Sequence, residues 1–322
     1  MPSAEVESSI AVAQRIADED LFPAAQDIDR AALIPLDRFA GLADAGLFGI
    51  VGPTKLGFGG LDVHEQRRVM ATVSSGCGAT FFAWVQHHGV VRAMSEASND
   101  ELREAWVPRL CRGEVVAGTA FAHLRRADRR AVTATRVSGG WRLEGFAPWA
   151  TSWGIAEIFT VAAESESGEV IWTLIDGVEQ SGLGVVPLAL AVFGSTGTVA
   201  LRFDGLVVPD NRVLGTDHAA SWRASDRVRA AAGQTGVLGV ADRATRLLGD
   251  EVRGPDDPAG NAARRLRIEL DDIWQRDRVV VESLGGGADD ALLAEASDHR
   301  AACLDLGQRA TTALLAARGG SG

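Results

Sequence analysis

The chain has 322 residues, of which 46% are hydrophobic and 23% are charged, and its formal net charge is −11. A chain of this length and composition can bury a large core, which excludes an intrinsically disordered protein and predicts two packed domains or one large one. The acidic balance argues against a general nucleic-acid binder, because such proteins need a concentrated cationic face. We therefore expect no nucleic-acid partner.

The cysteines are few and widely spaced. Cys77, Cys111 and Cys303 form an odd-numbered set without a CxxC motif, which argues against a disulfide scaffold and against a zinc knuckle. The first residues are polar and acidic rather than basic and then apolar, so no signal peptide is expected. The sequence contains no apolar run of about 18 residues, which predicts no membrane span. These features together predict a cytoplasmic protein.

The first 115 residues have the pattern of helices. Apolar residues recur at helical spacing in segments 6–17, 36–43, 62–76 and 77–96. Ser98 and Glu101 have the spacing of a capping box, which predicts one more helix from there to Leu110.

The pattern changes near Gly113 to short segments rich in β-branched and aromatic residues. These segments predict strands at 115–123, 131–137, 141–143, 157–163, 170–175 and 198–203. Ser138, Gly139 and Gly140 separate two of them and are typical of a hairpin turn. An all-β unit of about a hundred residues is therefore expected in the middle of the chain.

Helical patterns return at about Ser221 and predict three long helices, at 221–250, 258–284 and 288–317. Gly233, Gly236 and Gly239 lie within the first of them. Because they follow no strand, they do not match a dinucleotide-binding loop, and we expect them to permit close packing between helices. The resulting order of helices, strands and helices is uncommon and is the most informative coarse feature of the sequence.

Several short motifs follow one another along the chain. They are AGLFGIVGP at 45–53 with GFGG at 57–60, GTAFAHL at 118–124, WRLEG at 141–145 with WAT at 149–151, and FDGLVVP at 203–209 with VLG at 213–215. Their order and spacing resemble the acyl-CoA dehydrogenase family over nearly the whole chain. The resemblance implies an α+β fold with an N-terminal helical domain at 1–113, a central β-barrel domain at 114–217 and a C-terminal helical bundle at 218–322, with a truncated end as one alternative.

The resemblance also implies FAD as the cofactor. The segment at 121–123 lies where the family carries a flavin-contacting strand, and the segment at 149–151 matches the one that lies against the flavin ring. For Trp149 the alternative is a core tryptophan on a barrel strand. The cofactor-binding residues expected from the resemblance are Phe121, Ala122, His123, Trp149, Ala150, Thr151, Gly319 and Gly320.

The catalytic base of the family has no counterpart in this sequence. In the family it is a glutamate in one of two places; Arg229 occupies the first, and the second lies beyond the glycine turn at which the sequence ends. His87 and His88 are candidate catalytic residues, because histidine titrates near neutrality and their helix borders the acyl pocket in the family. The alternative is that one ring bonds a local backbone group while the other faces solvent. A glutamate in a C-terminal tail beyond Gly322 is the other candidate for the base. Adjacent histidines on a helix point about 100° apart, so we expect no metal site.

The resemblance implies an oxidoreductase that uses FAD to oxidise an acyl thioester, with CoA as the expected carrier, and that assembles as a homo-oligomer. Such a reaction needs a base for the α-proton, donors for the carbonyl and a flavin that accepts the hydride. The family's pyrophosphate-binding arginine also has no counterpart. Two alternatives therefore stay open: a non-catalytic subunit in a hetero-oligomer with a dehydrogenase, and a family member repurposed for flavin-dependent oxygenation or flavin-free chemistry in secondary metabolism.

Overall fold

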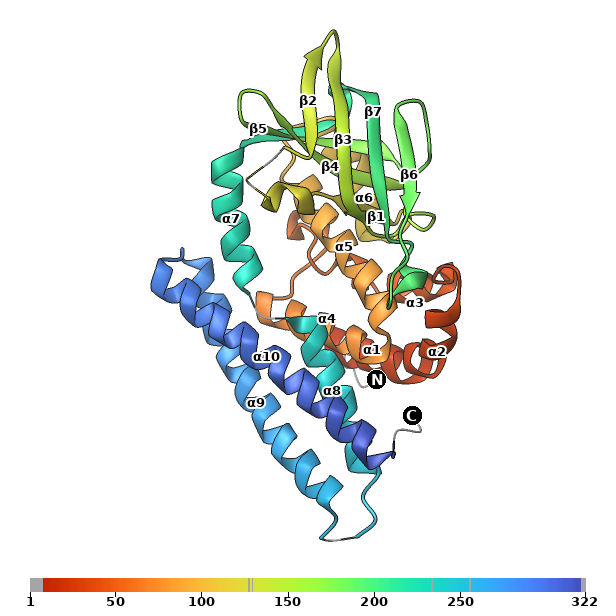
Figure 1. Ribbon diagram of the computed structural model, residues 1–322, viewed down its shortest axis with the longest axis vertical. Helices are drawn as coiled ribbons and strands as arrows, with labels where there is room; N and C mark the ends of the chain where they lie inside the picture. The colour runs from red at the N-terminus through yellow and green to blue at the C-terminus, as the bar shows by residue number, and fades with distance from the viewer. Residues whose placement is uncertain (1–7, 127, 129, 233, 255, 320–322) are drawn as a thin grey trace, which may run out of the picture. The chain divides into compact units, whose positions relative to one another are not determined.

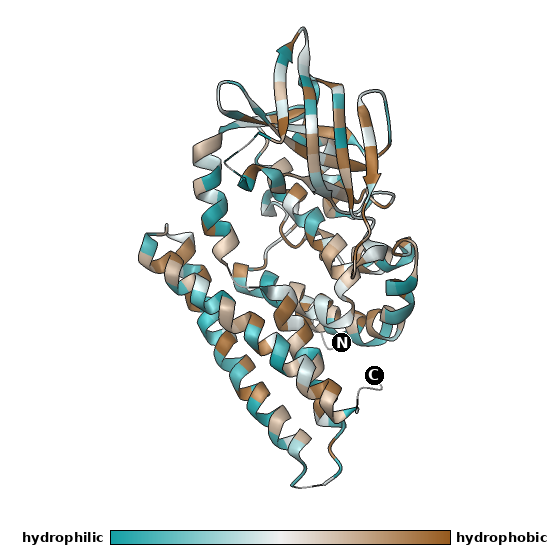
Figure 2. Ribbon diagram, in the orientation of Figure 1, coloured by the Kyte–Doolittle hydropathy of each residue, from teal (hydrophilic) through white to brown (hydrophobic). Residues whose placement is uncertain are grey.

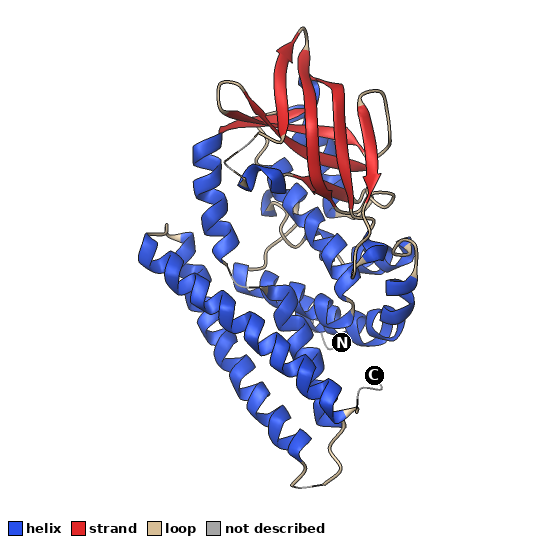
Figure 3. Ribbon diagram, in the orientation of Figure 1, coloured by secondary structure: helices blue, strands red, loops and turns tan. Residues whose placement is uncertain are grey.

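The structure is a computed structural model that describes residues 8–126, 128, 130–232, 234–254 and 256–319. Its elements follow the predicted order of helices, strands and helices (Figure 1, Figure 3). The helices are α1 Ser9–Ile16, α2 Phe22–Arg30, α3 Leu36–Asp44, α4 Val63–Gly76, α5 Gly78–Ser95, α6 Asp100–Cys111, α7 Ala219–Ala231, α8 Thr235–Asp250, α9 Pro258–Gly285 and α10 Asp290–Ala317. The strands are β1 Ala117–Ala120, β2 Val132–Val137, β3 Gly140–Ala150, β4 Ile158–Ser165, β5 Glu169–Asp176, β6 Leu183–Pro187, β7 Val199–Pro209 and β8 Val213–His218. Within the described ranges, the structure contains no helix that is both long and apolar enough to cross a membrane.

Contacts within the chain divide it into two compact units. Unit 1 comprises residues 1–23, 62–78 and 226–322, and unit 2 comprises residues 24–61 and 79–225. The N-terminal helices are therefore divided between the units instead of forming a unit of their own: α4 belongs to unit 1, whereas α3, α6 and nearly all of α5 belong to unit 2. All the strands lie in unit 2.

Unit 1 is a set of helices in which α8 packs against α4, α9 and α10. The buried face of α8 includes Leu238, Ala241 and Leu248, whose spacing of three and seven residues places them on one side of a helix. Trp274 of α9 and Leu306 of α10 complete this core. Figure 2 shows hydrophobic and hydrophilic residues interleaved along α9 and α10, as expected for helices that bury one face.

Gly239 permits a close approach between α8 and α4. A Cβ atom at this position would lie 1.9 Å from the carbonyl oxygen of Ala71, a distance that real Cβ atoms do not reach. The prediction of close helix packing at the glycine run is confirmed at Gly239, while Gly233 lies outside the described residues.

Unit 2 contains a sheet with the strand order β6-β7-β3-β2-β4-β5-β8, and β1 pairs with β4 beside this path. The pairs β1–β4 and β2–β4 are parallel and the other pairs are antiparallel. The predicted hairpin is confirmed, since Val137 pairs with Gly140 across a tight turn. Gly139 in that turn has φ +74°, a left-handed conformation that glycine adopts without strain.

Some boundaries differ from the predicted ones. Helix α6 is capped by Asn99 rather than Ser98, because the Asn99 side chain accepts a hydrogen bond of 3.1 Å from the Leu102 amide. Ser98 instead donates its hydroxyl to the Leu214 carbonyl at 3.1 Å. The segment predicted as one helix at 221–250 forms two, α7 and α8. Strands β6 and β8 were not predicted, since their glycines and terminal polar residues weaken the alternating pattern.

Candidate functional site

The segment 149–151 lies at the end of β3 in unit 2. Trp149 is 51% exposed, whereas Ala150 is fully buried and Thr151 is 6% exposed, so the indole is accessible and Thr151 is mostly covered. The pairing of β3 with β7 is irregular between Ala147 and Ala150. Irregularities of this kind re-aim side chains and often lie beside functional sites. Trp149 therefore offers a large aromatic face at the surface of the sheet.

The chain after Thr151 is held by the loop that precedes β7. The amides of Ser152 and Trp153 donate to the carbonyls of Thr196 and Gly197, both at 2.9 Å. Ser152 has φ +78°, which is uncommon for a residue with a side chain and persists only where its surroundings enforce it. These two hydrogen bonds supply that restraint, so the turn after Thr151 has a defined conformation.

A chain of hydroxyl groups leads from this loop to Thr151. Thr196 Oγ1 donates to the Phe193 carbonyl at 2.7 Å and lies 2.8 Å from Thr198 Oγ1. Thr198 Oγ1 in turn donates to Thr151 Oγ1 at 3.1 Å. Each threonine hydroxyl has one hydrogen and two lone pairs, so the Thr151 hydrogen remains available to a group outside the chain.

The segment 121–123 follows β1, and Gly118 within β1 lies close to Thr151. A Cβ atom at Gly118 would lie 2.7 Å from the Thr151 carbonyl oxygen and 2.3 Å from Cε1 of Phe159. Only a glycine lets β1 pass this closely. Gly118, three residues before the segment 121–123, therefore lies beside Thr151 in unit 2.

Phe121 and His123 are held by different surroundings. The Phe121 ring lies 6.1 Å from Trp172 and 6.0 Å from Trp222, between ring centroids. Ala122 and His123 are in a short 3-10 helix, η4 Ala122–Arg125, rather than in the predicted strand. His123 is 3% exposed, and burial lowers its pKa.

The neutral His123 ring has one defined tautomer. Its Nε2–H donates to the Ala162 carbonyl at 2.8 Å, because a carbonyl can only accept. Nδ1 is then a lone-pair acceptor, and it is buried without a hydrogen-bond partner among the described residues. A buried acceptor of this kind suits a ligand that donates a hydrogen bond.

His87 and His88 lie in the interior of unit 2 with their ring nitrogens close to backbone groups. Nδ1 of His87 accepts from the Ala117 amide at 3.1 Å, so its Nε2–H donates to the Leu110 carbonyl at 3.1 Å. Burial lowers the pKa of His87 to about 3. The His87 ring is thus neutral near pH 7, with both nitrogens in use.

The His88 ring is enclosed in a similar way. Nδ1 lies 3.1 Å from the Trp84 carbonyl and Nε2 lies 3.1 Å from the Leu47 carbonyl, and burial lowers the pKa of His88 to about 4. A base needs a free nitrogen within reach of a substrate proton. These contacts favour a structural role for His87 and His88 over the predicted role as a base.

The remaining predicted residues lie in unit 1. Arg229 is exposed near the end of α7, and Gly319 follows α10 with φ +65°. Gly320 lies outside the described residues. In the part of the chain that the structure describes, no group of three or more metal-ligating side chains converges.

The sequence reasoning did not single out Thr196 and Thr198, although both connect to Thr151. The available signal was the run Gly194-Ser-Thr-Gly-Thr198, in which glycines flank hydroxyl residues just before a strand. Gly197 has φ +61°, and a Cβ atom there would lie 2.2 Å from the Trp153 carbonyl oxygen. The second glycine of the run is thus required for the loop to reach β3.

Comparison with known proteins agrees with this architecture. Residues 3–114 match the N-terminal domain of acyl-CoA dehydrogenases. A curated relative, benzylmalonyl-CoA dehydrogenase from Aromatoleum aromaticum, is 27% identical over 248 residues, which cover 70% of this chain and 63% of the relative. The chain spans less than two thirds of the length of the curated relatives that it matches.

Solved structures share the fold over almost the whole chain. Butyryl-CoA dehydrogenase from Megasphaera elsdenii superposes with a TM-score of 0.81 and 14% identity, over 99% of this chain and 90% of the other. Dibenzothiophene monooxygenase from Paenibacillus sp. A11-2 superposes with a TM-score of 0.79 and 17% identity, over 98% and 88%. At these identities the likeness concerns the fold alone.

Proposed function

We propose that the chain, which resembles acyl-CoA dehydrogenases in its N-terminal domain and its fold, is an FAD-dependent oxidoreductase whose flavin ring lies against Trp149 and Thr151. The observation that carries this proposal is the pairing of a half-exposed indole with a threonine hydroxyl at the end of one strand. An isoalloxazine ring needs a flat apolar surface for its face and hydrogen-bonding groups for its edge. The residues present fit the ring portion of the cofactor.

The segment 121–123 supports the same site. Gly118 brings β1 against the Thr151 carbonyl, and Phe121, Ala122 and His123 directly follow that strand. The unpartnered Nδ1 of His123 would accept a hydrogen bond from the cofactor or its substrate. FAD supplies the hydride acceptor when it is bound; the protein supplies its orientation and the exclusion of water.

The substrate class that we propose is an acyl thioester. Its oxidation requires removal of a proton next to the carbonyl, and Arg229 stands where the family places its base. We do not assign this role to His87 and His88, since their ring nitrogens lie against the backbone. The proton acceptor therefore belongs to a group other than these histidines.

A second candidate function is flavin-dependent oxygenation. Arg229 favours it, because a reaction that starts from a reduced flavin and oxygen does not need a carboxylate at this position. The structural likeness to dibenzothiophene monooxygenase is compatible with it. The two functions differ in what reduces the flavin, and this difference can be measured.

We also propose that the chain forms a homo-oligomer through unit 1. Several apolar side chains on the last two helices are about half exposed or more: Ile268, Val279, Leu304 and Leu315. Such residues gather at interfaces between subunits more often than on free surfaces. Light scattering after size-exclusion chromatography is expected to give a multiple of the 33.9 kDa chain mass; a monomer at micromolar concentration would contradict this part of the proposal.

The visible absorption spectrum of the purified full chain, recorded before and after addition of FAD, tests the function. We expect about one bound flavin per chain, and bleaching of the flavin band when an acyl-CoA is added without oxygen. A bound flavin that no acyl-CoA bleaches, but that consumes oxygen and hydroxylates an added aromatic substrate once reduced by dithionite, would favour the second function. No flavin binding at micromolar FAD would overturn both, and would point to a non-catalytic subunit.

A further inference from the structure

Three threonine hydroxyls and one carbonyl form an unbroken line behind the proposed flavin position. The line runs from the Phe193 carbonyl through Thr196 and Thr198 to Thr151, with oxygen separations of 2.7, 2.8 and 3.1 Å. Thr196 is fully buried and Thr198 is 8% exposed. Both residues are buried, unlike the half-exposed Trp149, so we expect them to affect a bound cofactor only through their hydrogen bonds to Thr151.

The hydrogens along this line can be arranged in two ways. In the outward arrangement Thr198 donates to Thr151, which leaves the Thr151 hydrogen free to point away from the chain. In the inward arrangement Thr151 donates to Thr198, Thr198 donates to Thr196, and Thr196 donates to the Phe193 carbonyl. Either hydroxyl can be the donor between Thr196 and Thr198. In the outward arrangement Thr196 gives its single hydrogen to Thr198 instead of to the Phe193 carbonyl, and that carbonyl still accepts from the Thr196 amide at 3.1 Å.

The two arrangements offer opposite partners to a ligand. The outward arrangement presents Thr151 as a donor, and the inward one presents it as an acceptor. The hydrogen-bonding character of a flavin ring also reverses when it is reduced. Its central nitrogen accepts a hydrogen bond in the oxidised ring and donates one through an N–H in the reduced ring. Both states can therefore be matched by one threonine, provided that the line behind it can reverse.

We propose that Thr198 and Thr196 form a hydroxyl relay that switches Thr151 from hydrogen-bond donor to acceptor when the flavin is reduced. They are positioning residues, because they act on the cofactor only through Thr151. No proton enters or leaves the relay, since each hydroxyl only rotates its own hydrogen. This inference rests on the proposed function, because it assumes that the flavin ring lies at Thr151.

The relay makes a specific prediction for Thr198→Val. Valine has the shape of threonine without its hydroxyl, so Thr151 keeps its own hydrogen but loses the inward acceptor. The oxidised complex loses a donor to Thr151, whereas the reduced complex leaves a Thr151 hydroxyl hydrogen unsatisfied, which is the larger cost. We expect the ratio of the Kd for reduced FAD to the Kd for oxidised FAD to rise about three- to tenfold. For a two-electron couple a tenfold rise corresponds to a potential lower by about 30 mV.

The experiment measures both Kd values by flavin titration without oxygen, and the midpoint potential by spectroelectrochemistry. Thr198→Ser restores a hydroxyl and is expected to return the ratio to the wild-type value. Thr196→Val removes the far part of the relay and should shift the ratio in the same direction, which keeps the test decisive should Thr198→Val not fold. Thr173→Val is a matched control, since the buried Thr173 hydroxyl in the same sheet bonds the Val161 carbonyl at 3.1 Å outside the relay.

An unchanged ratio in folded Thr198→Val and Thr196→Val would overturn the relay while leaving the proposed function intact. An equal shift in Thr173→Val would also overturn it, because a general loosening of the sheet would then explain the effect. Failure of the wild-type chain to bind oxidised FAD would instead overturn the proposed function, on which the relay depends.

Discussion

Arg67 and Asp277 form an ion pair with two hydrogen bonds in the interior of unit 1. Arg67 Nε lies 2.8 Å from Asp277 Oδ2, and Arg67 Nη2 lies 2.6 Å from Oδ1. The carboxylate is fully buried, and His299 Nε2 lies 3.1 Å from the same Oδ1. One carboxylate therefore connects α4, α9 and α10.

Replacing this carboxylate with its amide should weaken unit 1 strongly. Asp277→Asn keeps the size of the side chain but removes the charge that balances Arg67 and His299 in the interior. Breaking a buried pair typically costs about 3–5 kcal/mol of unfolding free energy, and urea denaturation measures it. Asp305→Asn is the control, because exposed Asp305 pairs with Arg309 at 2.7 Å and such pairs contribute about 1 kcal/mol or less. Similar losses in both variants would contradict this prediction.

His299 should make the stability of unit 1 depend on alkaline pH. The hydrogen bond with Asp277, followed by the contact with Cys303, raises the pKa of His299 to about 9, against the effect of burial. Because the folded pKa lies above the unfolded value of about 6.5, the stabilisation is complete below pH 6.5 and is lost as the pH rises through 9. We expect the difference in unfolding free energy between wild type and His299→Gln to shrink by roughly 3 kcal/mol between pH 6 and pH 9.5. A difference that stays constant over this range would show that His299 is neutral throughout.

His87 and His88 should act in the opposite direction, at acid pH. Burial lowers the pKa of His87 to about 3 and that of His88 to about 4, so the unfolded chain binds their protons more readily. The stability of unit 2 should therefore fall as the pH drops from about 6.5 towards 4, by roughly 2 kcal/mol per histidine at pH 5. His87→Gln measured beside wild type between pH 7 and pH 4.5 should show a shallower slope. His218→Gln is the control, because His218 is exposed.

His87→Ala should destabilise unit 2 by about 2–4 kcal/mol at pH 7. The variant leaves the Ala117 amide and the Leu110 carbonyl without the ring that bonds both, and it opens a cavity in a packed core. Thermal unfolding followed by circular dichroism measures the loss. A fully stable His87→Ala that has lost activity would instead assign this histidine to the reaction.

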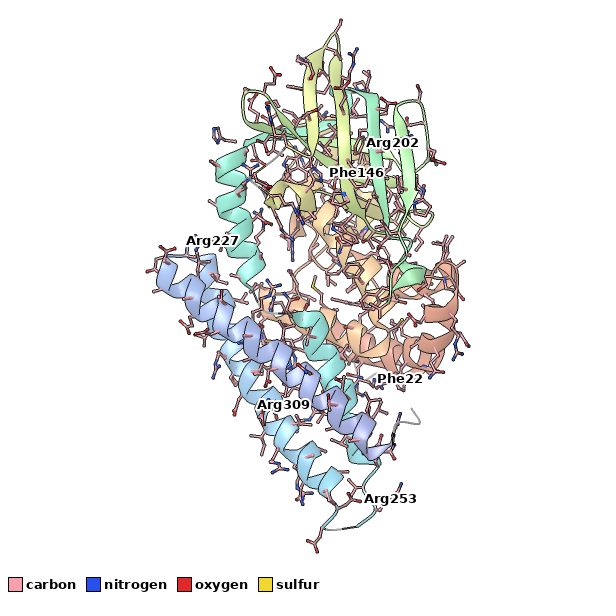
Figure 4. All side chains as sticks on the ribbon, in the orientation of Figure 1. Phe22, Phe146, Arg202, Arg227, Arg253 and Arg309 are labelled. Carbon is pink, nitrogen blue, oxygen red and sulfur yellow. The ribbon has the colours of Figure 1, made fainter. Side chains whose placement is uncertain are left out.

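Trp149 should contribute to flavin binding through its face. Trp149→Ala is expected to raise the Kd for FAD about tenfold or more, because it removes an aromatic surface that contributes about 1 kcal/mol beyond its buried area. Trp149→Phe should recover most of the affinity. Phe146→Ala is the matched control: Phe146 is a 43% exposed aromatic residue on the same strand, opposite Arg202 of β7 (Figure 4). Equal effects of the two alanine variants would place the flavin elsewhere.

Gly118 should tolerate no side chain. In Gly118→Ala the new methyl group would lie 2.3 Å from the Phe159 ring and 2.7 Å from the Thr151 carbonyl, so β1 must move away from Thr151. We expect a loss of about 1–3 kcal/mol in stability and weaker flavin binding. Gly184→Ala is the control, since its nearest neighbour would be the Arg202 side chain at 3.6 Å. A neutral Gly118→Ala would mean that β1 can shift without cost.

Much of the fold could be predicted because its local signals agree. The predicted segments 62–76, 77–96, 258–284 and 288–317 match helices α4, α5, α9 and α10 within a few residues, and the hairpin at Gly139 follows its turn residues. The division of the chain into units could not be predicted, because it depends on contacts between distant segments such as Gly239 and Ala71. Sequence periodicity shows which face of α4 is buried but not which helix covers it.

In the candidate site, too, some residues could be predicted from the sequence and others could not. Trp149 and Thr151 could be named from the sequence, since their motif is short and continuous. Thr196 and Thr198 could not, because only the folded loop brings their hydroxyls to Thr151. His87 and His88 attracted attention as polar residues in an apolar helix, yet the backbone groups that face them explain their presence. A buried polar residue indicates a partner but not its identity.

The division into units also sets an order of events during synthesis. Unit 2 has all of its residues once position 225 has been made, whereas unit 1 waits for residues beyond 225 to join α1 and α4. Until then the apolar side chains of α4, among them Val69 and Val73, have no bundle to cover them. During synthesis, α4 therefore exposes apolar side chains between segments of unit 2 that can already fold. We expect a ribosome-associated chaperone to bind the growing chain at α4.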